Sequence, residues 1–216
     1  MKQINFYFDV ISPYAYLAFE KLPMALQGLS YSIQYRPVVF GAILQHFGQL
    51  GPAEIKPKRT WTYRQIQWLA RQQNTPLQMP ASHPFNPLQI LRLALACNAS
   101  RDEGSCNRYI AETIFKHVWQ SGQDAADPQR LQALIERLKP AHAIDDPAIK
   151  ARLKANTHAA IAAGVFGVPL LEVTGQHFWG LDALPMLRAY LEGDAWFASP
   201  AWLQAGESPS GVIRKR

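Results

Sequence analysis

The stretch INFYFDVISPYAYL, residues 4–17, passes from a strand pattern directly into a helix pattern and decides the fold of the chain. In its first half, Ile4, Phe6 and Phe8 alternate with asparagine and tyrosine. This period of two predicts a strand over residues 3–9 with the three apolar side chains on one face. That face needs a hydrophobic core to cover it.

The second half of this stretch starts a helix. Ser12 is a good N-cap and Pro13 a good first helical residue, so a helix is predicted over residues 13–27. Gly28 is a typical stop signal, and a second strand is predicted over residues 31–39. The chain therefore opens with a βαβ unit.

Helical periodicity follows from Gly41 to Gly164, and strand character returns only after it. The helices predicted in this block cover residues 57–74, 87–101, 106–120, 127–138 and 147–163. Two short strands are predicted over 169–173 and 176–179, joined at Thr174-Gly175, and a last helix over 182–191.

The order βαβ, helical block, ββα predicts an α/β protein with a thioredoxin-like fold and a large all-helical insertion. Residues 1–40 and 165–195 form the thioredoxin-like domain in this prediction, and residues 41–164 form the insertion domain. Residues 196–216 are expected to be an irregular tail whose aromatic side chains either dock on the body or line a dimer interface.

Thioredoxin-like proteins keep a reactive cysteine at the start of the first helix, and this chain has Ser12 there. Without a protein thiolate at this place it cannot run disulfide exchange by itself, so a sulfur atom would have to arrive with a ligand. The two cysteines, Cys97 and Cys106, are interpreted as a small buried residue and a loop thiol. The six histidines lack metal-site spacing, and no metal is predicted.

Composition favours a cytoplasmic enzyme that acts on a small anionic molecule. The 216 residues carry a net charge of +6, but Lys and Arg are scattered, apart from the run Arg214-Lys215-Arg216. No basic stripe or reader motif supports nucleic-acid binding, whereas a modest positive field attracts a small anion. No apolar run is long enough for a membrane span, and the start lacks a signal-peptide pattern.

A second ligand-facing feature is GVFGVP, residues 164–169, just before the returning strand. An X-Pro bond is usually trans, but the thioredoxin layout predicts a cis bond between Val168 and Pro169. Such a bond turns the backbone amide and carbonyl before the proline outward, opposite the helix start. A peptide-like ligand can pair with this open edge, as in β-augmentation.

The third feature is the turn FWGLD, residues 178–182, at the start of the last helix. The backbone amides of Leu181 and Asp182 offer donors to a carboxylate, and the Asp182 side chain can pair with an ammonium group or cap the helix. The hydroxyl of Ser12 adds a donor at the positive end of a helix. These features suit a short zwitterionic peptide that carries a thiol, and glutathione fits this description.

Several motifs, in a particular order and spacing, carry a family resemblance. They are FYFDVISPYAYLA, the Gly48-Gln49 segment leading to Lys58, His83-Pro84-Phe85-Asn86-Pro87 with Arg92, Gly-Val-Phe-Gly-Val-Pro, and Trp-Gly-x-Asp. Together they resemble the 2-hydroxychromene-2-carboxylate isomerases, relatives of kappa-class glutathione transferases and of DsbA oxidoreductases. The similarity covers residues 3 to about 192.

The resemblance implies roles for individual residues. It implies that Ser12 hydrogen-bonds the glutathione sulfur and stabilises its thiolate, and that Val168, before Pro169, pairs with the cysteinyl backbone. The other glutathione-binding residues that it implies are Leu181 and Asp182 at the γ-glutamyl end, Lys58 near the glycyl carboxylate or the substrate, and Gln49.

The chain departs from the family pattern at three places. Gln49 replaces the usual Asn, Leu181 a small polar residue, and Ala183 an Arg. Loss of the guanidinium removes a bidentate partner for a carboxylate.

The implied activity is glutathione-dependent isomerisation in aromatic catabolism, between 2-hydroxychromene-2-carboxylate and trans-o-hydroxybenzylidenepyruvate. Reversible thiolate addition leaves a single bond about which the adduct rotates. Trp61, Tyr63 and Lys58 are candidate walls for the aromatic acid, and the family implies a homodimer. The alternatives are a kappa-class-like glutathione transferase or peroxidase and a non-catalytic thioredoxin-like binding module.

Overall fold

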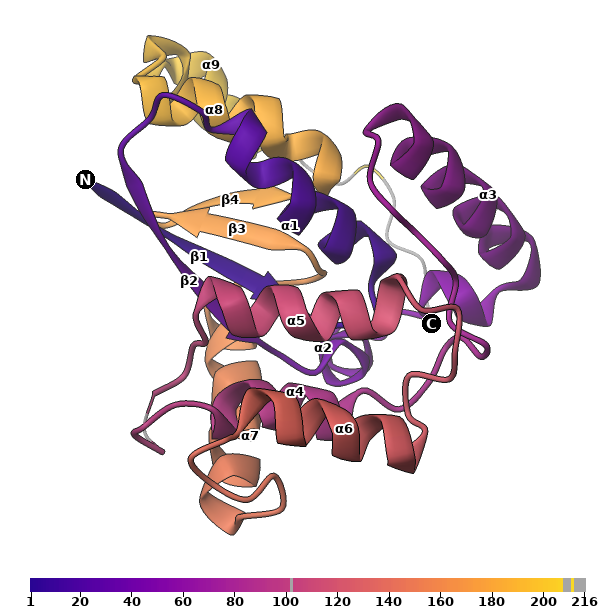
Figure 1. Cartoon of the computed structure of the whole chain (residues 1–216). Helices are drawn as coiled ribbons and strands as arrows, with labels where there is room; N and C mark the ends of the chain where they lie inside the picture. The colour runs from indigo at the N-terminus through magenta and orange to yellow at the C-terminus, as the bar shows by residue number, and fades with distance from the viewer. Residues whose placement is uncertain (102, 208–210, 212–216) are drawn as a thin grey trace.

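The computed structural model describes residues 1–101, 103–207 and 211. Figure 1 shows a four-stranded sheet with helices on both faces and one helix, α3, standing to one side. The strands are β1 (Lys2–Phe8), β2 (Tyr31–Pro37), β3 (Leu170–Val173) and β4 (Gln176–Trp179). The α-helices are α1 (Pro13–Ala25), α2 (Phe40–His46), α3 (Lys56–Gln72), α4 (Leu88–Ala96), α5 (Arg108–Trp119), α6 (Pro128–Leu138), α7 (Pro147–Ala162), α8 (Leu184–Glu192) and α9 (Pro200–Ala205). Short 3-10 helices are η1 (Pro52–Glu54), η2 (Leu181–Ala183) and η3 (Ala195–Ala198).

The sheet has the strand order β2-β1-β3-β4. β1 pairs in parallel with β2, as a crossover through α1 requires, and antiparallel with β3. β3 and β4 form a hairpin whose turn residues, Thr174 and Gly175, have φ angles of 49° and 83°. This arrangement confirms the predicted thioredoxin-like layout of βαβ followed by ββα.

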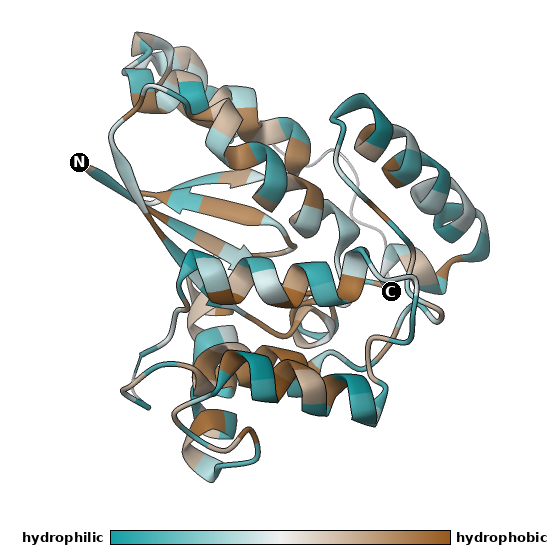
Figure 2. Ribbon diagram, in the orientation of Figure 1, coloured by the Kyte–Doolittle hydropathy of each residue, from teal (hydrophilic) through white to brown (hydrophobic). Residues whose placement is uncertain are grey.

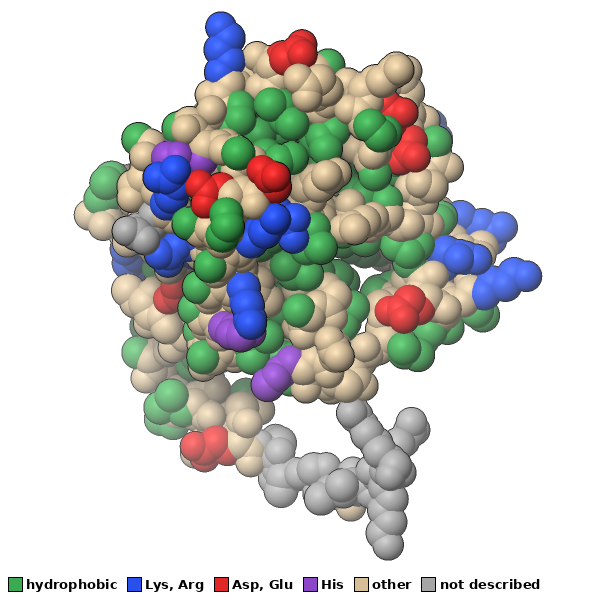
Figure 3. Space-filling model, turned by 90° about the horizontal axis from the view of Figure 1, so that it is seen from below, with side chains coloured by type: hydrophobic (Ala, Val, Ile, Leu, Met, Phe, Trp, Pro, Cys, Tyr) green, Lys and Arg blue, Asp and Glu red, His purple; other side chains and the backbone are tan. Residues whose placement is uncertain are grey.

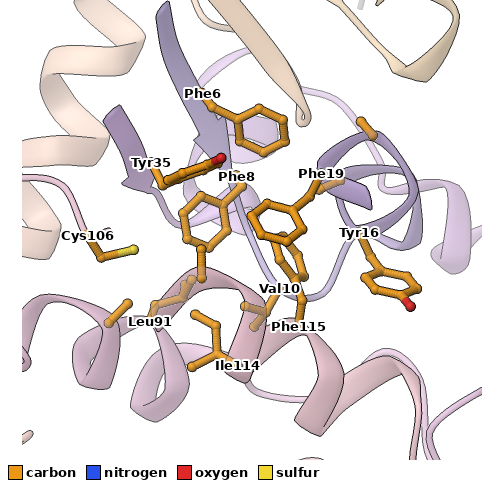
Figure 4. Packing of buried hydrophobic residues seen from close by; sticks show 14 of the residues in the cluster. Phe6, Phe8, Val10, Tyr16, Phe19, Tyr35, Leu91, Cys106, Ile114 and Phe115 are labelled. Carbon is orange, nitrogen blue, oxygen red and sulfur yellow. The ribbon is translucent and has the colours of Figure 1, made fainter. Parts of the chain in front are cut away.

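The larger core covers the face of β1 that Ile4, Phe6 and Phe8 share. The rings of Phe8 and Phe19 each lie 5.2 Å from the ring of Phe115, so the cluster joins β1, α1 and α5 (Figure 4). Burying a side chain of this size contributes about 1.5–3 kcal/mol to folding. Figure 2 shows where hydrophobic residues gather: on the strands and on α4, which lies behind α6 in this view.

A smaller cluster covers the opposite face of the sheet, where α2 and α7 pack. Leu170 belongs to this cluster and its neighbour Leu171 to the larger one, as expected for adjacent residues of a strand. The side chain of Val168 also packs in the smaller cluster. The residue before Pro169 is therefore anchored through its side chain.

The five helices predicted between residues 57 and 163 are present, with ends shifted by a few residues. The largest shift is in α4, which ends at Ala96 instead of residue 101. The sequence reasoning did not predict α2, because this helix is short and its N-cap, Val39, makes no side-chain capping bond. A helix without a capping residue gives no start signal in the sequence.

The expectation of an irregular tail is wrong for the part of the tail that the structure describes. Asp194 and Ser199 act as N-caps, through their side chains, for η3 and α9. The ring of Phe197 packs on that of Tyr190 at 5.2 Å, so the tail docks on α8. The basic run Arg214-Lys215-Arg216 lies outside the described residues.

The surface offers no single basic stripe on the face that Figure 3 shows, where Lys and Arg side chains occupy separate places among acidic and hydrophobic ones. Among the described residues, none of the helices combines the length and the apolar character that a membrane crossing needs.

Candidate active site

Ser12 lies between β1 and α1 and contacts two parts of the chain. Its Oγ accepts a hydrogen bond from the amide of Ala15 at 3.2 Å, which makes it the N-cap of α1, as predicted. The same hydroxyl donates to the carbonyl oxygen of Val168 at 3.2 Å. Because only 6% of Ser12 is exposed, the hydroxyl has to turn from this carbonyl to serve a ligand atom placed beside it.

Asp9 is fully buried at the end of β1 and organises the loop before Ser12. One carboxylate oxygen accepts from the amide of Ile11 at 3.0 Å, and the other from the amide of Phe40 at 2.9 Å. Burial raises the pKa of Asp9 from its ordinary 3.8 to about 7, against the opposing effect of these two hydrogen bonds. Asp9 thus joins the loop to α2 and titrates near neutral pH.

Two side chains of the helical block bond to carbonyl groups of the same loop. Nε1 of Trp119 donates to the carbonyl of Val10 at 2.9 Å, and Nε2 of His83 lies 2.8 Å from the carbonyl of Ile11. Burial lowers the pKa of His83, which favours a neutral ring with its proton on Nε2, facing the carbonyl. Nδ1 then accepts from the hydroxyl of Tyr63 at 2.7 Å. Residues far along the chain therefore fix the loop that presents the serine.

A groove of about 720 Å³ opens beside the backbone of Val168. Its floor is α1, one wall is α3, and the other wall is the end of the β4 hairpin with η2 and α8. The predicted site residues that line it are Val168, Pro169, Leu181 and Asp182. Ser12 does not line the groove itself, but its hydroxyl contacts the carbonyl of Val168, which does. The volume is in the range of small-molecule sites.

The turn between β4 and α8 differs from the expectation in one respect. Gly180 has a φ of 97°, a conformation that favours glycine, and η2 precedes α8 without a side-chain capping bond. The expectation that Asp182 caps the last helix is therefore wrong. A carboxylate oxygen of Asp182 instead lies 2.5 Å from where a Cβ on Gly180 would be, so glycine is the residue that fits there. The Val168–Pro169 bond across the groove is cis.

The groove also contains residues that the sequence reasoning did not assign to the site. Tyr14, on the first turn of α1, donates to Oε1 of Gln65 on α3 at 2.6 Å. Burial, with a smaller contribution from the Asp182 carboxylate, raises the pKa of Tyr14 and keeps the phenol neutral. Tyr14 stands two positions after Ser12 in one motif, which was a usable signal. Gln65 reaches the site only through helix packing, which the sequence does not reveal.

Trp179 and Phe166 form an aromatic edge next to Val168. Their rings meet edge to face at 5.1 Å, and Trp179 is 55% exposed. A Cβ on Gly167 would lie 2.7 Å from Nε1 of Trp179, so the indole can keep this place only beside a glycine. An exposed aromatic pair of this kind offers a surface to a flat apolar ligand.

Gln49 and Lys58, both predicted glutathione ligands, do not line the groove. Gln49 is exposed after α2, and its backbone amide donates to the carbonyl of Leu44 at 2.9 Å. Lys58 is exposed on the first turn of α3. Of the candidate walls on α3, Trp61 is 65% exposed and Tyr63 is engaged with His83. The roles of Gln49 and Lys58 stay predictions.

The protein's own thiols are unsuited to supply a nucleophile. Burial raises the pKa of Cys97 to about 11 and raises that of Cys106, which is fully buried, further. Neither thiol is ionised near neutral pH. Within the described ranges, His, Cys, Asp and Glu side chains form no group of three that could hold a metal ion.

Comparison with known proteins identifies a DSBA-like thioredoxin domain over residues 3–192. The 2-hydroxychromene-2-carboxylate isomerase of Sphingobium xenophagum is 29% identical over 197 residues, which cover 88% of this chain and 98% of that protein. Human glutathione S-transferase kappa 1 is 25% identical over 212 residues, covering 90% and 92%. A solved structure of 2-hydroxychromene-2-carboxylate isomerase has a TM-score of 0.76 and 24% identity over 96% of this chain and 100% of its own, and it supports the fold.

Proposed function

The chain belongs to the DSBA-like thioredoxin family, and from this membership and the site around Ser12 we propose that it is a glutathione-dependent isomerase of aromatic acids. It is an enzyme of the isomerase class, as its relatives indicate. The proposed reaction interconverts 2-hydroxychromene-2-carboxylate and trans-o-hydroxybenzylidenepyruvate, because relatives named for this isomerase align over most of the chain.

The observation that carries the proposal is the contact between the Ser12 hydroxyl and the carbonyl of Val168. It places a hydroxyl donor, the positive end of α1 and a backbone edge at one point beside the groove. A thiol-bearing peptide that pairs with the edge would bring its sulfur next to this hydroxyl. Both of the protein's own cysteines are poor sources of thiolate, so the sulfur of a ligand is the better candidate.

The residues present fit glutathione at three places. The Val168 backbone would pair with its cysteinyl part, and Leu181 and Asp182 line the groove where its γ-glutamyl end would lie. Ser12 would face the sulfur. Glutathione, when bound, supplies a thiolate that adds reversibly to a conjugated carbon–carbon bond.

The chain's own residues have two tasks in this proposal. Ser12 and the α1 N-terminus lower the pKa of a neighbouring thiol, because a hydrogen bond and a positive dipole favour its anion. Trp179 and Phe166 offer a face to the aromatic ring. The neutral phenol of Tyr14 would donate to the acid or its carbonyl only after its O–H turns away from Oε1 of Gln65. Positioning of the electrophile against the sulfur supplies the rest of the rate.

A second candidate is transfer of glutathione to an electrophile or reduction of a peroxide, supported by the match to human kappa-class transferase over 90% of the chain. Conjugation would use the same residues and differs from isomerisation in that the glutathione adduct is released as the product. Peroxide reduction would use the same activated thiol, which is oxidised instead of forming an adduct. The non-catalytic alternative keeps the Val168 edge without thiol activation.

The test is a thermal-shift titration with glutathione, followed by the ultraviolet thiolate absorbance of the bound thiol and by an isomerisation assay with glutathione returned unchanged. Stabilisation, thiolate absorbance and turnover of the aromatic acid are the expected results. Conjugate accumulation instead of isomer would favour the transferase. Absence of both stabilisation and thiolate absorbance would rule out both enzyme readings.

We further propose that the enzyme acts in the cytoplasm as a homodimer and that residues 41–164 form an insertion domain within the thioredoxin-like unit. Size-exclusion chromatography with light scattering tests the dimer, and a mass of 24.3 kDa in solution would contradict it.

A further inference from the structure

A second pocket, of about 430 Å³, opens between β2, the loop before α5 and α7, and we call it the β2 pocket. β2 forms one edge of the sheet, whereas β4, which borders the groove, forms the other edge. In Figure 1, α7 and α3, which border the pocket and the groove respectively, lie apart from each other. None of the predicted glutathione-binding residues lines the β2 pocket. Its volume suits a small molecule.

Arg36, on β2, lines this pocket, and its guanidinium is held from two sides. Nε donates to Oδ1 of Asn5 at 2.8 Å, and Nη2 donates to Oε1 of Gln34. Asn5 is itself held, because its Nδ2 donates to a carboxylate oxygen of Glu172 at 2.5 Å. Arg36 forms no ion pair with an acidic side chain that the structure describes. Its third nitrogen, Nη1, therefore remains to bind an anion in the pocket.

Asn156, on α7, brings an acceptor to the same pocket. Only 9% of this residue is exposed, and its Nδ2 donates to the carbonyls of Pro37 at 3.1 Å and Gly104 at 2.7 Å. Its Oδ1 accepts no hydrogen bond from the described residues, yet it is not among the unpaired atoms that are sealed from solvent. A ligand in the pocket can therefore reach this oxygen.

The donor and the acceptor border one small space beside Gly104. A Cβ on this glycine would lie 2.5 Å from Oδ1 of Asn156 and 3.5 Å from Nη1 of Arg36. A single small molecule placed there can contact both atoms. The glycine leaves the space open, because any side chain at position 104 would enter it.

The charges around the pocket indicate which molecule fits. Arg152 lines it from α7 and Glu103 from the loop before α5, so the lining carries both signs of charge. A ligand that satisfies Arg36 needs an anionic acceptor, because a guanidinium binds carboxylates in preference to neutral groups. A ligand that satisfies Asn156 needs an N–H or O–H donor, and a nearby carboxylate favours a cationic one. An α-amino acid carries both groups on one carbon atom.

We propose that the β2 pocket binds a small polar α-amino acid. Its carboxylate accepts from Nη1 of Arg36, with Arg152 adding positive charge, and its ammonium donates to Oδ1 of Asn156, with Glu103 adding negative charge. Ser105, which also lines the pocket, favours a polar side chain on the ligand. This site is separate from the groove beside Ser12, so the inference does not depend on the proposed function.

Calorimetric titration of the full chain with L-serine tests the site. L-glycerate has the same skeleton with a hydroxyl in place of the ammonium, and 2-aminoethanol lacks the carboxylate. We expect saturable binding of L-serine and roughly tenfold weaker binding of each analogue, because each loses one charge-assisted hydrogen bond. Equal binding of L-serine and L-glycerate would overturn the assignment to an amino acid. Absence of L-serine binding at about 10 mM would overturn the site.

Arg36→Gln removes the cation and is expected to weaken L-serine binding roughly tenfold. Arg64→Gln, at an exposed position of α3, makes the same change of charge far from the pocket and should leave L-serine binding unchanged. Wild-type affinity for L-serine in Arg36→Gln would overturn the site.

Gly104→Ala is the second variant, because Arg36→Gln also loses the bonds to Asn5 and Gln34. Gly104 has no positive φ, so alanine is compatible with its backbone, and the added methyl group is expected to abolish L-serine binding by filling the space. Thermal unfolding of both variants and titration with glutathione are the controls for folding, and both should match the wild type. Loss of L-serine binding only together with a lowered unfolding temperature would overturn the assignment, since a disturbed fold would then explain it.

Discussion

The floor and one wall of the groove, α1 and α3, are built in opposite ways. α1 buries seven of its 13 residues, whereas the longer α3 buries two of 17. Trp61 and Trp68 on α3 are 65% and 59% exposed, and Figure 1 shows this helix standing away from the body. The floor helix, α1, is therefore part of the core, whereas the wall helix, α3, contributes few side chains to it.

This difference separates two tasks. Asp9, Trp119 and His83 hold the loop before α1, so the backbone that presents Ser12 is fixed in place. Elements with few buried residues open and shift most easily, and in this site that element is α3. Changes in the floor should therefore alter rate or stability, and changes in the wall should alter substrate choice with little effect on folding.

Ser12→Ala tests the floor most severely. We expect the turnover rate to fall by about 10²–10³, the usual effect of removing one donor to a developing anion. Stability should fall by only about 0.5–2 kcal/mol, because an N-cap is lost. Ser199→Ala removes a similar cap from α9 and should leave turnover unchanged. Steady-state kinetics and urea unfolding measure both variants, and full turnover in Ser12→Ala would remove the serine from the mechanism.

Asp9→Asn tests how the floor depends on pH. Because the folded-state pKa of Asp9 is raised from 3.8 to about 7, its contribution to stability is full below pH 4 and is lost as the pH rises through 7. Wild-type stability should therefore decline relative to Asp9→Asn by about 3 kcal/mol between pH 4 and pH 7.5. Urea unfolding across this range measures the difference. Parallel curves for the two proteins would show that the pKa of Asp9 is not raised in the folded state.

The floor helix and the strand before it could be predicted from the sequence, because the residues that mark them lie close together in the chain. Ser12 and Pro13 mark a helix start, and the alternation of Ile4, Phe6 and Phe8 marks the buried face of a strand. Backbone geometry then brings the helix start and the returning strand together, since β1, which leads into the helix, pairs with β3 in one sheet. The thioredoxin-like layout could therefore be predicted.

The wall could not be predicted in the same way, because its contacts depend on how separate helices pack. Nothing around Gln65 in the sequence indicates that it contacts α1, and Lys58 was predicted as a site residue instead. The packing of His83 under the loop before Ser12 is equally invisible in the chain order. Motif spacing identifies residues on the same element more reliably than residues on opposite sides of a groove.

Two tryptophans offer a matched comparison: Trp119 holds the loop before the floor helix α1, and Trp68 lies on the wall helix α3. Trp119→Phe keeps an aromatic ring but leaves the buried carbonyl of Val10 without its donor, which should cost about 1–3 kcal/mol of unfolding free energy. Trp68→Phe, on the exposed side of α3, should change stability by less than about 0.5 kcal/mol. Thermal and urea unfolding compare the pair. Equal losses of unfolding free energy in the two variants would contradict the distinction between a buried floor and an exposed wall.

The smallest effect is expected at the opposite wall, where Gly167→Ala pushes the indole of Trp179 out of place. The new Cβ would lie 2.7 Å from Nε1, but the indole is 55% exposed and can swing into solvent, so stability should fall by less than about 1 kcal/mol. The KM for the aromatic acid should rise several-fold while kcat is kept, because the stacking face is lost and Ser12 is untouched. Gly41→Ala, where an added Cβ meets open space, is the control and should leave the KM unchanged. A fall in kcat at constant KM would instead show that Trp179, like Ser12, acts on the turnover rate and not on substrate binding.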